Sequence, residues 1–179
     1  MKKLALTDFA KYRYPSALEL SPDGRYLTFA LKEVDREGDG YRWNLWLYDL
    51  ERRESRQITQ GDDQRKAVWE DNTHILYKTT ELDEAMRARG FEEEWTVYHR
   101  LNVCTGEECE AFRLPMSVSG LWKMDEGRYI FTGETHLDRP NLLELTGEAL
   151  EKELVRRQQT RGYKVLTELP LCENGVGMF

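Results

Sequence analysis

Apolar and polar side chains alternate in short runs along most of the chain, a pattern typical of half-buried β-strands. The clearest run extends from Leu18 to Ala30 and contains the turn sequence Ser21-Pro22-Asp23-Gly24. Proline presets φ at the second position of a turn and glycine accepts positive φ, so the run is predicted to fold into a hairpin. Trp43 to Leu50 and Ser55 to Thr59, separated by polar residues 51–54, predict a second hairpin.

The same four-strand pattern recurs further along the chain. Val68 to Tyr77 and Leu121 to Phe131 repeat strand, turn and strand, with Asn72 and Gly127 at the position of Gly24. Asparagine is the residue that follows glycine in tolerating positive φ. These positions are about 48 and 55 residues apart, and the third strands also correspond, since residues 48–54 align with 101–107. Such repeats predict a β-propeller, a ring of four-stranded blades.

Two segments interrupt the strands and are predicted to be helices. Residues 81–94 contain few β-branched residues and would lie between the second and third strands of the second repeat. In the second segment, 141–160, Thr146 is a candidate N-cap, and Glu153 and Arg157 have the i,i+4 spacing of an exposed helix. The apolar residues expected on one side of this helix are Ala149, Leu150, Leu154 and Val155. Both helices are expected to decorate the rim of the propeller, and a lid or contact element is the alternative.

The predicted fold class is all-β with helical insertions: an incomplete β-propeller of about two and a half four-stranded blades. Tyr163 to Pro170 is predicted to resume as a strand, so the third repeat lacks its outer strands. Since a ring usually needs about four blades, this chain is not expected to close one by itself. The predicted domain covers residues 1–179, with blade 1 at about 16–60, blade 2 at about 66–114 including the insertion 81–94, and a partial blade 3 at about 117–179 including the insertion 141–160.

Charge and hydropathy exclude several classes of function. The 179 residues include 26 Lys and Arg against 33 Asp and Glu, a formal net charge of −7, with the basic residues scattered. Nucleic acid is therefore not an expected partner. No apolar run approaches the roughly 20 residues that span a bilayer, and Thr7-Asp8 ends the first apolar stretch, so we expect no membrane span and no signal peptide. The expected location is the cytoplasm.

Cysteines, histidines and acidic loops give no strong metal or disulfide signal. Cys104 and Cys109 flank a hairpin-like stretch and Cys172 stands apart, so reduced thiols are expected and one Cys104–Cys109 disulfide is the alternative. No cysteine pair has zinc-knuckle spacing. Residues 35–40 imitate the start of a calcium loop, but its twelfth position is Trp46 and not glutamate, so a solvated loop is expected. We expect no metal and no other cofactor.

Several segments together resemble a known family. Ser21 to Phe29, followed by Asn44 to Leu50 and Arg56 to Thr59, resembles the first propeller blade of prolyl oligopeptidase family serine peptidases, in their acylaminoacyl-peptidase and dipeptidyl-peptidase branch. Leu6 to Phe9 is similar to the opening of bacterial members of that branch. The resemblance extends over essentially the whole chain. The Ser-Pro-Asp-Gly turn also occurs in TolB-like periplasmic propellers.

The resemblance implies an N-terminal propeller of about seven blades that caps a C-terminal α/β-hydrolase domain and restricts access to short peptides. That domain carries a Ser-His-Asp triad. None of the serines of this chain lies in a G-x-S-x-G nucleophile elbow: they are Ser16, Ser21, Ser55, Ser117 and Ser119. No alternation of strands and helices follows them either. The triad is therefore expected to lie outside this chain.

The remaining candidates for chemistry are three histidines and an acidic run. His74 is predicted at a strand position equivalent to Tyr26 and Tyr129, His99 is predicted in a third strand, and His136 precedes the second helix; structural roles are expected for all three. Glu92-Glu93-Glu94-Trp95 is compared with the glutamate pair with which dipeptidyl-peptidase relatives hold a substrate ammonium group. The order of aromatic and acidic residues differs, so an exposed end of the insertion is expected and substrate binding is the alternative.

The sequence thus predicts a non-catalytic propeller segment that, in a full enzyme, gates short peptides and docks against a hydrolase domain. That missing domain and the peptide substrates are the expected partners. The rival interpretations are a stand-alone protein-interaction module and a TolB-like propeller protein, the latter disfavoured by the absent signal sequence. Because incomplete blades leave strand edges unpaired, self-association through an edge or an exchanged strand is also expected.

Overall fold

The computed structural model describes residues 6–35, 40–125, 127–135 and 139–160. They belong to two units, Met1–Thr135 and His136–Phe179, which we describe separately. The predicted strand from Tyr163 to Pro170, the central residues 36–39 of the calcium-like loop, His136 and Cys172 lie outside the described residues.

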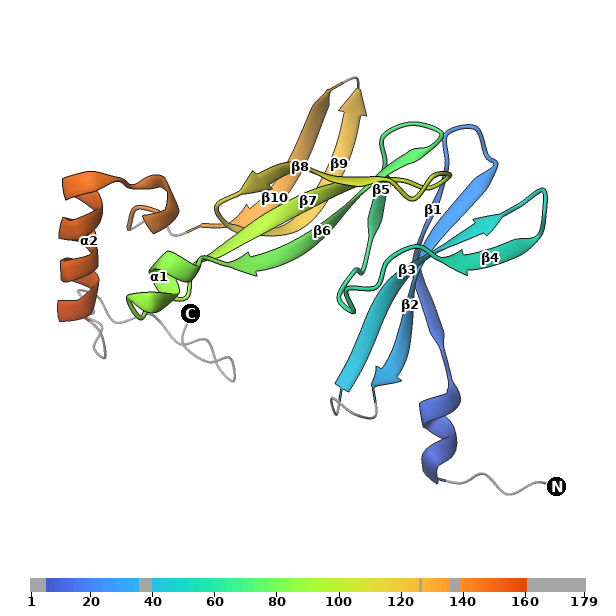
Figure 1. Cartoon of the computed structure of the whole chain (residues 1–179), viewed down its shortest axis with the longest axis horizontal. Coiled ribbons are helices and arrows are strands. Elements are labelled where there is room, and N and C mark those ends of the chain that lie inside the picture. Colours follow the sequence, from blue (N-terminus) through green and yellow to red (C-terminus); the bar gives the residue numbers. More distant parts are fainter. Residues whose placement is uncertain (1–5, 36–39, 126, 136–138, 161–179) are drawn as a thin grey trace, which may run out of the picture. The chain divides into compact units, whose positions relative to one another are not determined.

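The first unit begins with a four-stranded antiparallel sheet, blade 1, whose strands are neighbours in chain order (Figure 1). The strands are β1 (Tyr14–Leu20), β2 (Tyr26–Asp35), β3 (Gly40–Asp49) and β4 (Glu54–Gln57), preceded by the 3-10 helix η1 (Leu6–Lys11). Alternation along β2 is visible in its burial, because Thr28 and Ala30 are buried whereas Leu27 and Phe29 are half-buried. One sheet face therefore lies in a core and the other does not.

The second sheet, blade 2, repeats this arrangement. Its strands are β5 (Ala67–Trp69), β6 (His74–Leu82), β7 (Glu94–Asn102) and β8 (Glu108–Leu114), with the helix α1 (Glu84–Ala88) between β6 and β7. A helix was predicted at this point, but over the longer range 81–94. It is shorter because the hairpin continues beyond the strands: the Asp83 amide donates to the Glu93 carbonyl at 2.9 Å.

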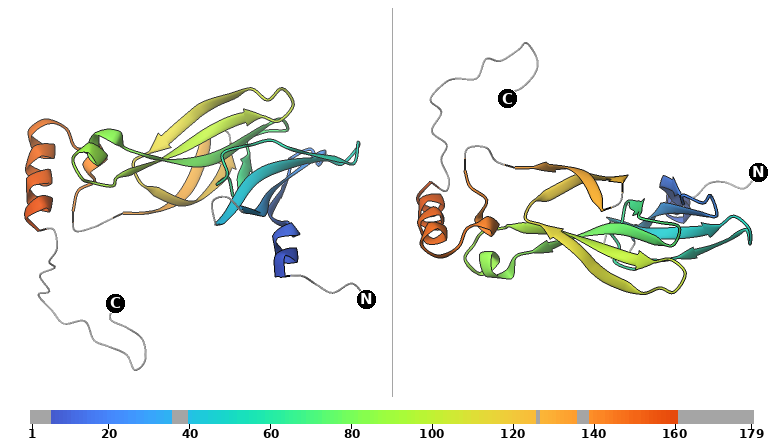
Figure 2. Two further views of the ribbon diagram at one scale, coloured as in Figure 1. Left: turned by 60° about the horizontal axis from the view of Figure 1, so that its bottom comes forward. Right: turned by 90° about the horizontal axis from the view of Figure 1, so that it is seen from above.

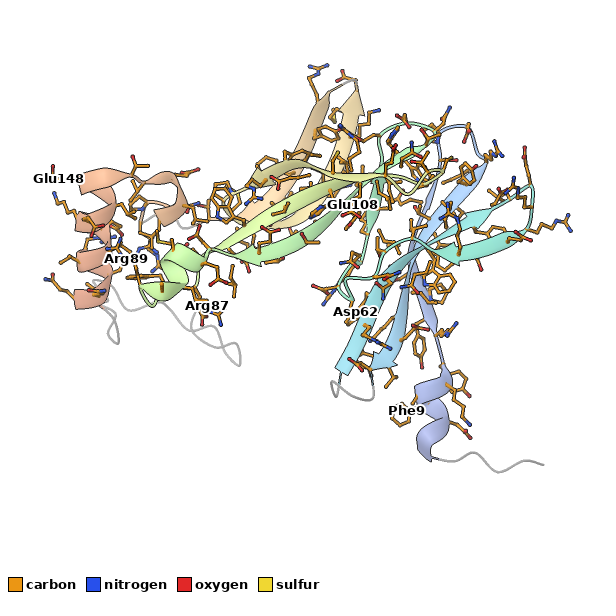
Figure 3. The ribbon with its side chains drawn as sticks, viewed as in Figure 1. Phe9, Asp62, Arg87, Arg89, Glu108 and Glu148 are labelled. Carbon is orange, nitrogen blue, oxygen red and sulfur yellow. The ribbon has the colours of Figure 1, made fainter. Side chains whose placement is uncertain are left out.

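The connection between the two blades runs beside β3. The Trp43 amide donates to the Asp62 carbonyl and the Gln64 amide donates to the Trp43 carbonyl, both at 2.9 Å. Asn44 Nδ2 also donates to Asp62 Oδ1 at 2.9 Å. Asp62, labelled in Figure 3, adopts a positive φ of 63° to turn the chain here.

The third sheet of the first unit contains two strands, β9 (Ser117–Asp125) and β10 (Arg128–Glu134). Figure 2 shows this hairpin beside the sheet of blade 2 and not within it. Three successive sheets of four, four and two strands, with few helices, form an open, incomplete propeller. The predicted fold class is therefore confirmed.

Two cores hold the three sheets together. Between blades 1 and 2, Tyr26, Ala30 and Leu45 face Ile75 and Trp69, and the rings of Tyr26 and Trp69 stack with centroids 6.5 Å apart. The core between blades 2 and 3 contains Leu76, Tyr98, Val118 and Leu121. Each fully buried leucine or isoleucine contributes about 2 kcal/mol through removal from water, so face-to-face packing is the main stabilising contact between blades.

The turns between first and second strands share an aspartate but differ in length. In blade 1, Gly24 has φ +72° and its amide donates to the Ser21 carbonyl at 2.9 Å, as the turn sequence predicts. In blade 1 the Ser21 amide donates to the Tyr26 carbonyl, whereas in blade 2 the Glu70 amide donates to the His74 carbonyl. The turn of blade 2 is therefore one residue shorter. The prediction of positive φ at Asn72 is wrong, since Asn72 is not among the residues with positive φ. The shorter turn does not need that conformation.

Register also corrects the predicted equivalence of His74 and Tyr129. The first pairs of the inner hairpins are Leu20↔Leu27, Trp69↔Ile75 and, after a bulge at Arg128, Lys123↔Tyr129. Tyr129 therefore corresponds to Ile75, one residue beyond His74, and the extra residue of the bulge is Met124 in β9. The predicted alignment of third strands is confirmed, since Leu27 pairs with Tyr48 and Ile75 pairs with Leu101.

The described part of the second unit contains a 3-10 helix, η2 (Leu142–Glu144), and α2 (Gly147–Gln159). Leu154 is buried, but Ala149 and Val155 are exposed, so the predicted apolar side is narrower than expected. Thr146 is the N-cap residue, although its side chain makes no capping hydrogen bond. Glu153 accepts from Arg156 and Arg157, which hold the pKa of its carboxyl at about 2 against a smaller opposing effect of burial.

Candidate functional site

The candidate site is a cleft of about 710 Å³ between blades 2 and 3, at the ends of their inner hairpins. Its principal lining residues are Glu70, Asp71, His74, Arg100, Lys123 and Tyr129. This volume is in the range of small-ligand sites, but such sites are mostly apolar and this lining is charged. We call it the hairpin cleft.

Glu70 is the centre of the hairpin cleft, directly after β5. Its carboxylate accepts from Arg100 through Nε and, at 2.8 Å, through Nη2, and from the Tyr129 hydroxyl at 2.5 Å. Lys123 Nζ donates to the Glu70 carbonyl oxygen. Because Glu70 and Arg100 belong to blade 2 while Lys123 and Tyr129 belong to blade 3, the network joins the two blades.

The electrostatics of this network keep Glu70 ionised. The Arg100 guanidinium lowers the pKa of the Glu70 carboxyl, more than burial raises it, and the Tyr129 hydroxyl lowers it further. Burial, followed by the hydrogen bond to Glu70, raises the pKa of Tyr129 to about 12. Tyr129 is thus a hydrogen-bond donor at neutral pH, and the arrangement is that of a structural ion pair with a phenol donor.

A second chain of hydrogen bonds in the hairpin cleft orients His74. Asp71 Oδ1 accepts from the backbone amides of Thr73 and His74, each at 2.7 Å, and Asp71 Oδ2 lies 2.9 Å from His74 Nδ1. Burial would raise the pKa of Asp71, but these backbone and ring hydrogen bonds outweigh it and hold the pKa at about 2. Asn102 Oδ1 accepts from the Cys104 and Thr105 amides, so its Nδ2 donates to His74 Nε2 at 3.1 Å. In the neutral ring, this arrangement places the proton on Nδ1, toward Asp71.

His99 lies elsewhere, on the face of blade 2 that packs toward blade 1. Its Nε2 is 2.9 Å from Thr79 Oγ1, and its ring stacks on Tyr77 with centroids 5.3 Å apart. The Tyr77 hydroxyl donates to Glu108 at 2.7 Å; Glu108, labelled in Figure 3, begins β8. Burial, and then Glu108, raises the pKa of Tyr77 above its ordinary value. The structure does not bring His99 and His74 together, because their side chains are on opposite faces of blade 2.

A second, smaller cleft of about 380 Å³ lies between blades 1 and 2 and includes Tyr26, Asp49, Arg56 and Cys104. The Tyr26 hydroxyl oxygen is 3.8 Å from Cys104 Sγ, and this contact, followed by burial, raises the pKa of Tyr26. Arg56 donates to the Val103 carbonyl and so ties β4 to the outer turn of blade 2. Cys104 and Cys109 are exposed free thiols.

The acidic run Glu92-Glu93-Glu94-Trp95 follows α1 and does not lie on it. Glu94 is the first residue of β7, and Trp95 Nε1 donates to Asp83 Oδ2 at 3.0 Å. Asp83 is the N-cap of α1 and accepts from the Met86 amide at 2.9 Å. The aromatic residue of this run is therefore used to fix the short helix.

Within residues 6–35, 40–125, 127–135 and 139–160, no group of three or more His, Cys, Asp or Glu side chains has a metal-binding arrangement. In the same ranges, every helix is too short or too polar to cross a bilayer. Asp35 and Gly40, the two described ends of the calcium-like loop, are paired strand residues.

The network around Glu70 was not predicted from the sequence. Arg100, Lys123 and Tyr129 lie 30, 53 and 59 residues beyond Glu70, and the sequence alone does not specify the register between blades. Only one local signal points to this network. It is an aspartate or glutamate directly after the first strand of a blade, together with a tyrosine early in the next blade.

No family model matches the sequence, and no curated protein matches it either. Solved structures, in contrast, do match this chain. The β-propeller domain of the Trilobed protease from Pyrococcus furiosus, which has an open velcro topology, superposes with a TM-score of 0.50 at 14% identity over 69% of this chain and 34% of that chain. The acylaminoacyl peptidase of Pyrococcus horikoshii superposes with a TM-score of 0.52 at 15% identity over 70% of this chain and 18% of that one. This chain thus spans about a third of that propeller domain and under a fifth of the acylaminoacyl peptidase chain, and the likeness is one of fold.

Proposed function

We propose that this chain is the non-catalytic N-terminal propeller segment of a serine peptidase of the prolyl oligopeptidase family. The observation that carries the proposal is the stacking of β1–β4, β5–β8 and β9–β10 as successive blades, a fold shared with the propeller domain of one protease and with an acylaminoacyl peptidase. Fold alone does not assign a function. The second support is the resemblance of Ser21 to Phe29, Asn44 to Leu50 and Arg56 to Thr59 to the first blade of that family.

The roles of the polar residues agree with a structural segment. Ser21 donates to Asp23 at 2.7 Å and accepts from the Tyr26 amide at 2.9 Å, so its hydroxyl stabilises the first turn. His74 is bonded to Asp71 and Asn102 within its own blade. In the hairpin cleft, the half-buried carboxylate of Glu70 is neutralised by Arg100. These groups are used in holding turns and blades, which is what a scaffold requires.

In the full enzyme, this segment would contribute part of a ring above a C-terminal hydrolase domain. The ring would admit short peptides through its centre and exclude folded proteins, while peptide-bond hydrolysis would take place at a Ser-His-Asp triad in the other domain. The partners in this proposal are that hydrolase domain and peptide substrates. A propeller limits access by size, because its blades are rigid sheets around a narrow channel.

Labelling with a fluorophosphonate probe tests the assignment. The purified 179-residue chain is expected to remain unlabelled. The product of the complete reading frame is expected to be labelled at a serine beyond residue 179, in a G-x-S-x-G sequence. Labelling of the 179-residue chain, or a reading frame that stops after the codon of Phe179, would contradict the proposal. Comparison of short peptides with an unfolded protein as substrates then tests the size filter.

A further inference from the structure

The leading face of blade 1, which we define as Leu20, Leu27, Phe29 and Trp46 on the side away from blade 2, is an apolar sheet face. Phe29 and Trp46 are paired in register and their rings stack with centroids 6.5 Å apart. Leu20 is 55% exposed, whereas Leu27, Phe29 and Trp46 are half-buried. A patch of this kind on a soluble protein usually marks an interaction surface.

Blade 2 has a corresponding leading face, the side that packs toward blade 1, and it shows what kind of surface covers such a face. Trp69 and Ile75 occupy the positions that correspond to Leu20 and Leu27, and they are only 8% and 0% exposed. They are covered by the opposite, trailing face of the preceding blade, through Tyr26 and Ala30. The leading face of blade 1 is therefore shaped for the trailing face of another blade.

The first unit carries one further trailing face, that of the β9–β10 hairpin. Trp122 and Ile130 are cross-strand partners on it and are 47% and 51% exposed. Gly120 makes room for the Trp122 ring, because a Cβ at residue 120 would lie 2.4 Å from that ring. Lys66 Nζ lies 5.6 Å from the centroid of the Trp122 ring, so the apolar contact on this face is made by Ile130 and the exposed part of the indole.

We propose that a second copy of this chain packs the trailing face of its β9–β10 hairpin on the leading face of blade 1. The chain holds both halves of one contact, and the geometry already present between blades 1 and 2 supplies the mode of packing. Because the two halves are different surfaces, the association is head-to-tail and continues from copy to copy until a ring closes. This inference concerns the 179-residue chain by itself and is separate from the proposed function, because in a longer enzyme further blades of the same chain would cover both faces.

Sedimentation velocity and light scattering on the 179-residue chain test the proposal. The wild-type chain is expected to exceed the monomer mass of 21.2 kDa increasingly as concentration rises. Leu20→Glu, in the leading face, and Ile130→Glu, in the trailing face, are each expected to raise the concentration needed for association by at least about tenfold. Leu50→Glu, at an exposed leucine in the turn after β3, is the matched control and is expected to associate like wild type. Circular dichroism establishes that each variant is folded.

An equimolar mixture of Leu20→Glu and Ile130→Glu gives the sharpest result. The first variant keeps a trailing face and the second keeps a leading face, so the mixture is expected to form a species of two chains and nothing larger. A wild-type chain that remains monomeric at millimolar concentration would overturn the proposal. Association of Leu20→Glu by itself would also overturn it, because that is the result expected if β10 edges pair with one another. A mixture of the two variants that forms no dimer would overturn it as well.

Discussion

At the scale of single residues, the two outer turns show how one backbone shape accepts different side chains. Arg53 and Gly106 occupy the same position after their third strands, and their amides donate to the Asp49 and Asn102 carbonyls at 2.8 Å in both turns. Both have positive φ, 58° for Arg53 and 80° for Gly106. A side chain with a Cβ is strained in this region by about 1 kcal/mol, so blade 1 carries a strain that blade 2 avoids.

Arg53→Gly is accordingly expected to stabilise the chain, by up to about 1 kcal/mol, because relief of strain exceeds the extra entropy of glycine in the unfolded state. Gly106→Ala is expected to destabilise it by about 1 kcal/mol, although a Cβ at that position would meet no neighbouring atom. Free energies of unfolding from urea titrations measure both. If Arg53→Gly lowers the stability, the guanidinium makes a contact that outweighs the backbone effect.

At the scale of elements, Glu70 acts as a clamp between blades 2 and 3. Its side chain is 11% exposed, and its charge is compensated by the guanidinium of Arg100, which is itself 47% exposed. The Tyr129 hydroxyl adds the bond that crosses from β10 to blade 2. A buried carboxylate joined to two elements stabilises their relative position more than a surface ion pair does.

Removal of this clamp is expected to destabilise the packing of blade 3. Glu70→Ala should lower the free energy of unfolding by about 2 kcal/mol, and a double-mutant cycle with Tyr129→Phe should show a coupling of about 1 kcal/mol. Arg128→Ala is the control, because its pair with Asp125 is exposed and lies within one hairpin; no measurable change is expected. Zero coupling between Glu70 and Tyr129 would mean that the bond across the blades is not formed.

The sequence predicted those strands and turns that depend only on residues close together in the chain. The Ser21 to Gly24 turn and the alternation along β2 required only neighbouring residues, and both agree with the structure. The length of α1 was overestimated because helix propensity in residues 81–94 competes with hairpin pairing, which extends β6 to Leu82 and starts β7 at Glu94. Asn72 was misplaced because the turn of blade 2 is one residue shorter than that of blade 1, and Tyr129 was misplaced because the extra residue Met124 in β9 shifts the pairing of the hairpin.

At the scale of the whole molecule, the described residues of the first unit build successive blades joined by face-to-face cores. The repeat in the sequence predicted this arrangement, since each repeat has an apolar face to bury. Contacts between blades, such as Glu70 with Tyr129, could not be predicted, because they depend on how sheets separated by about 50 residues come into register. The candidate site is made of such contacts.

The stacking of blades 1 and 2 is tested most directly by a nuclear Overhauser spectrum of the 179-residue chain, read at the side chain of Trp69. The indole Nε1 donates to the Glu19 carbonyl oxygen at 3.1 Å, and the ring stacks on Tyr26 of the other blade. We expect cross-peaks from Trp69 to protons of β1 and to the Tyr26 ring, together with slow exchange of the indole proton. Cross-peaks confined to β5–β8, with an indole proton that exchanges at the rate of free tryptophan, would contradict the arrangement in blades.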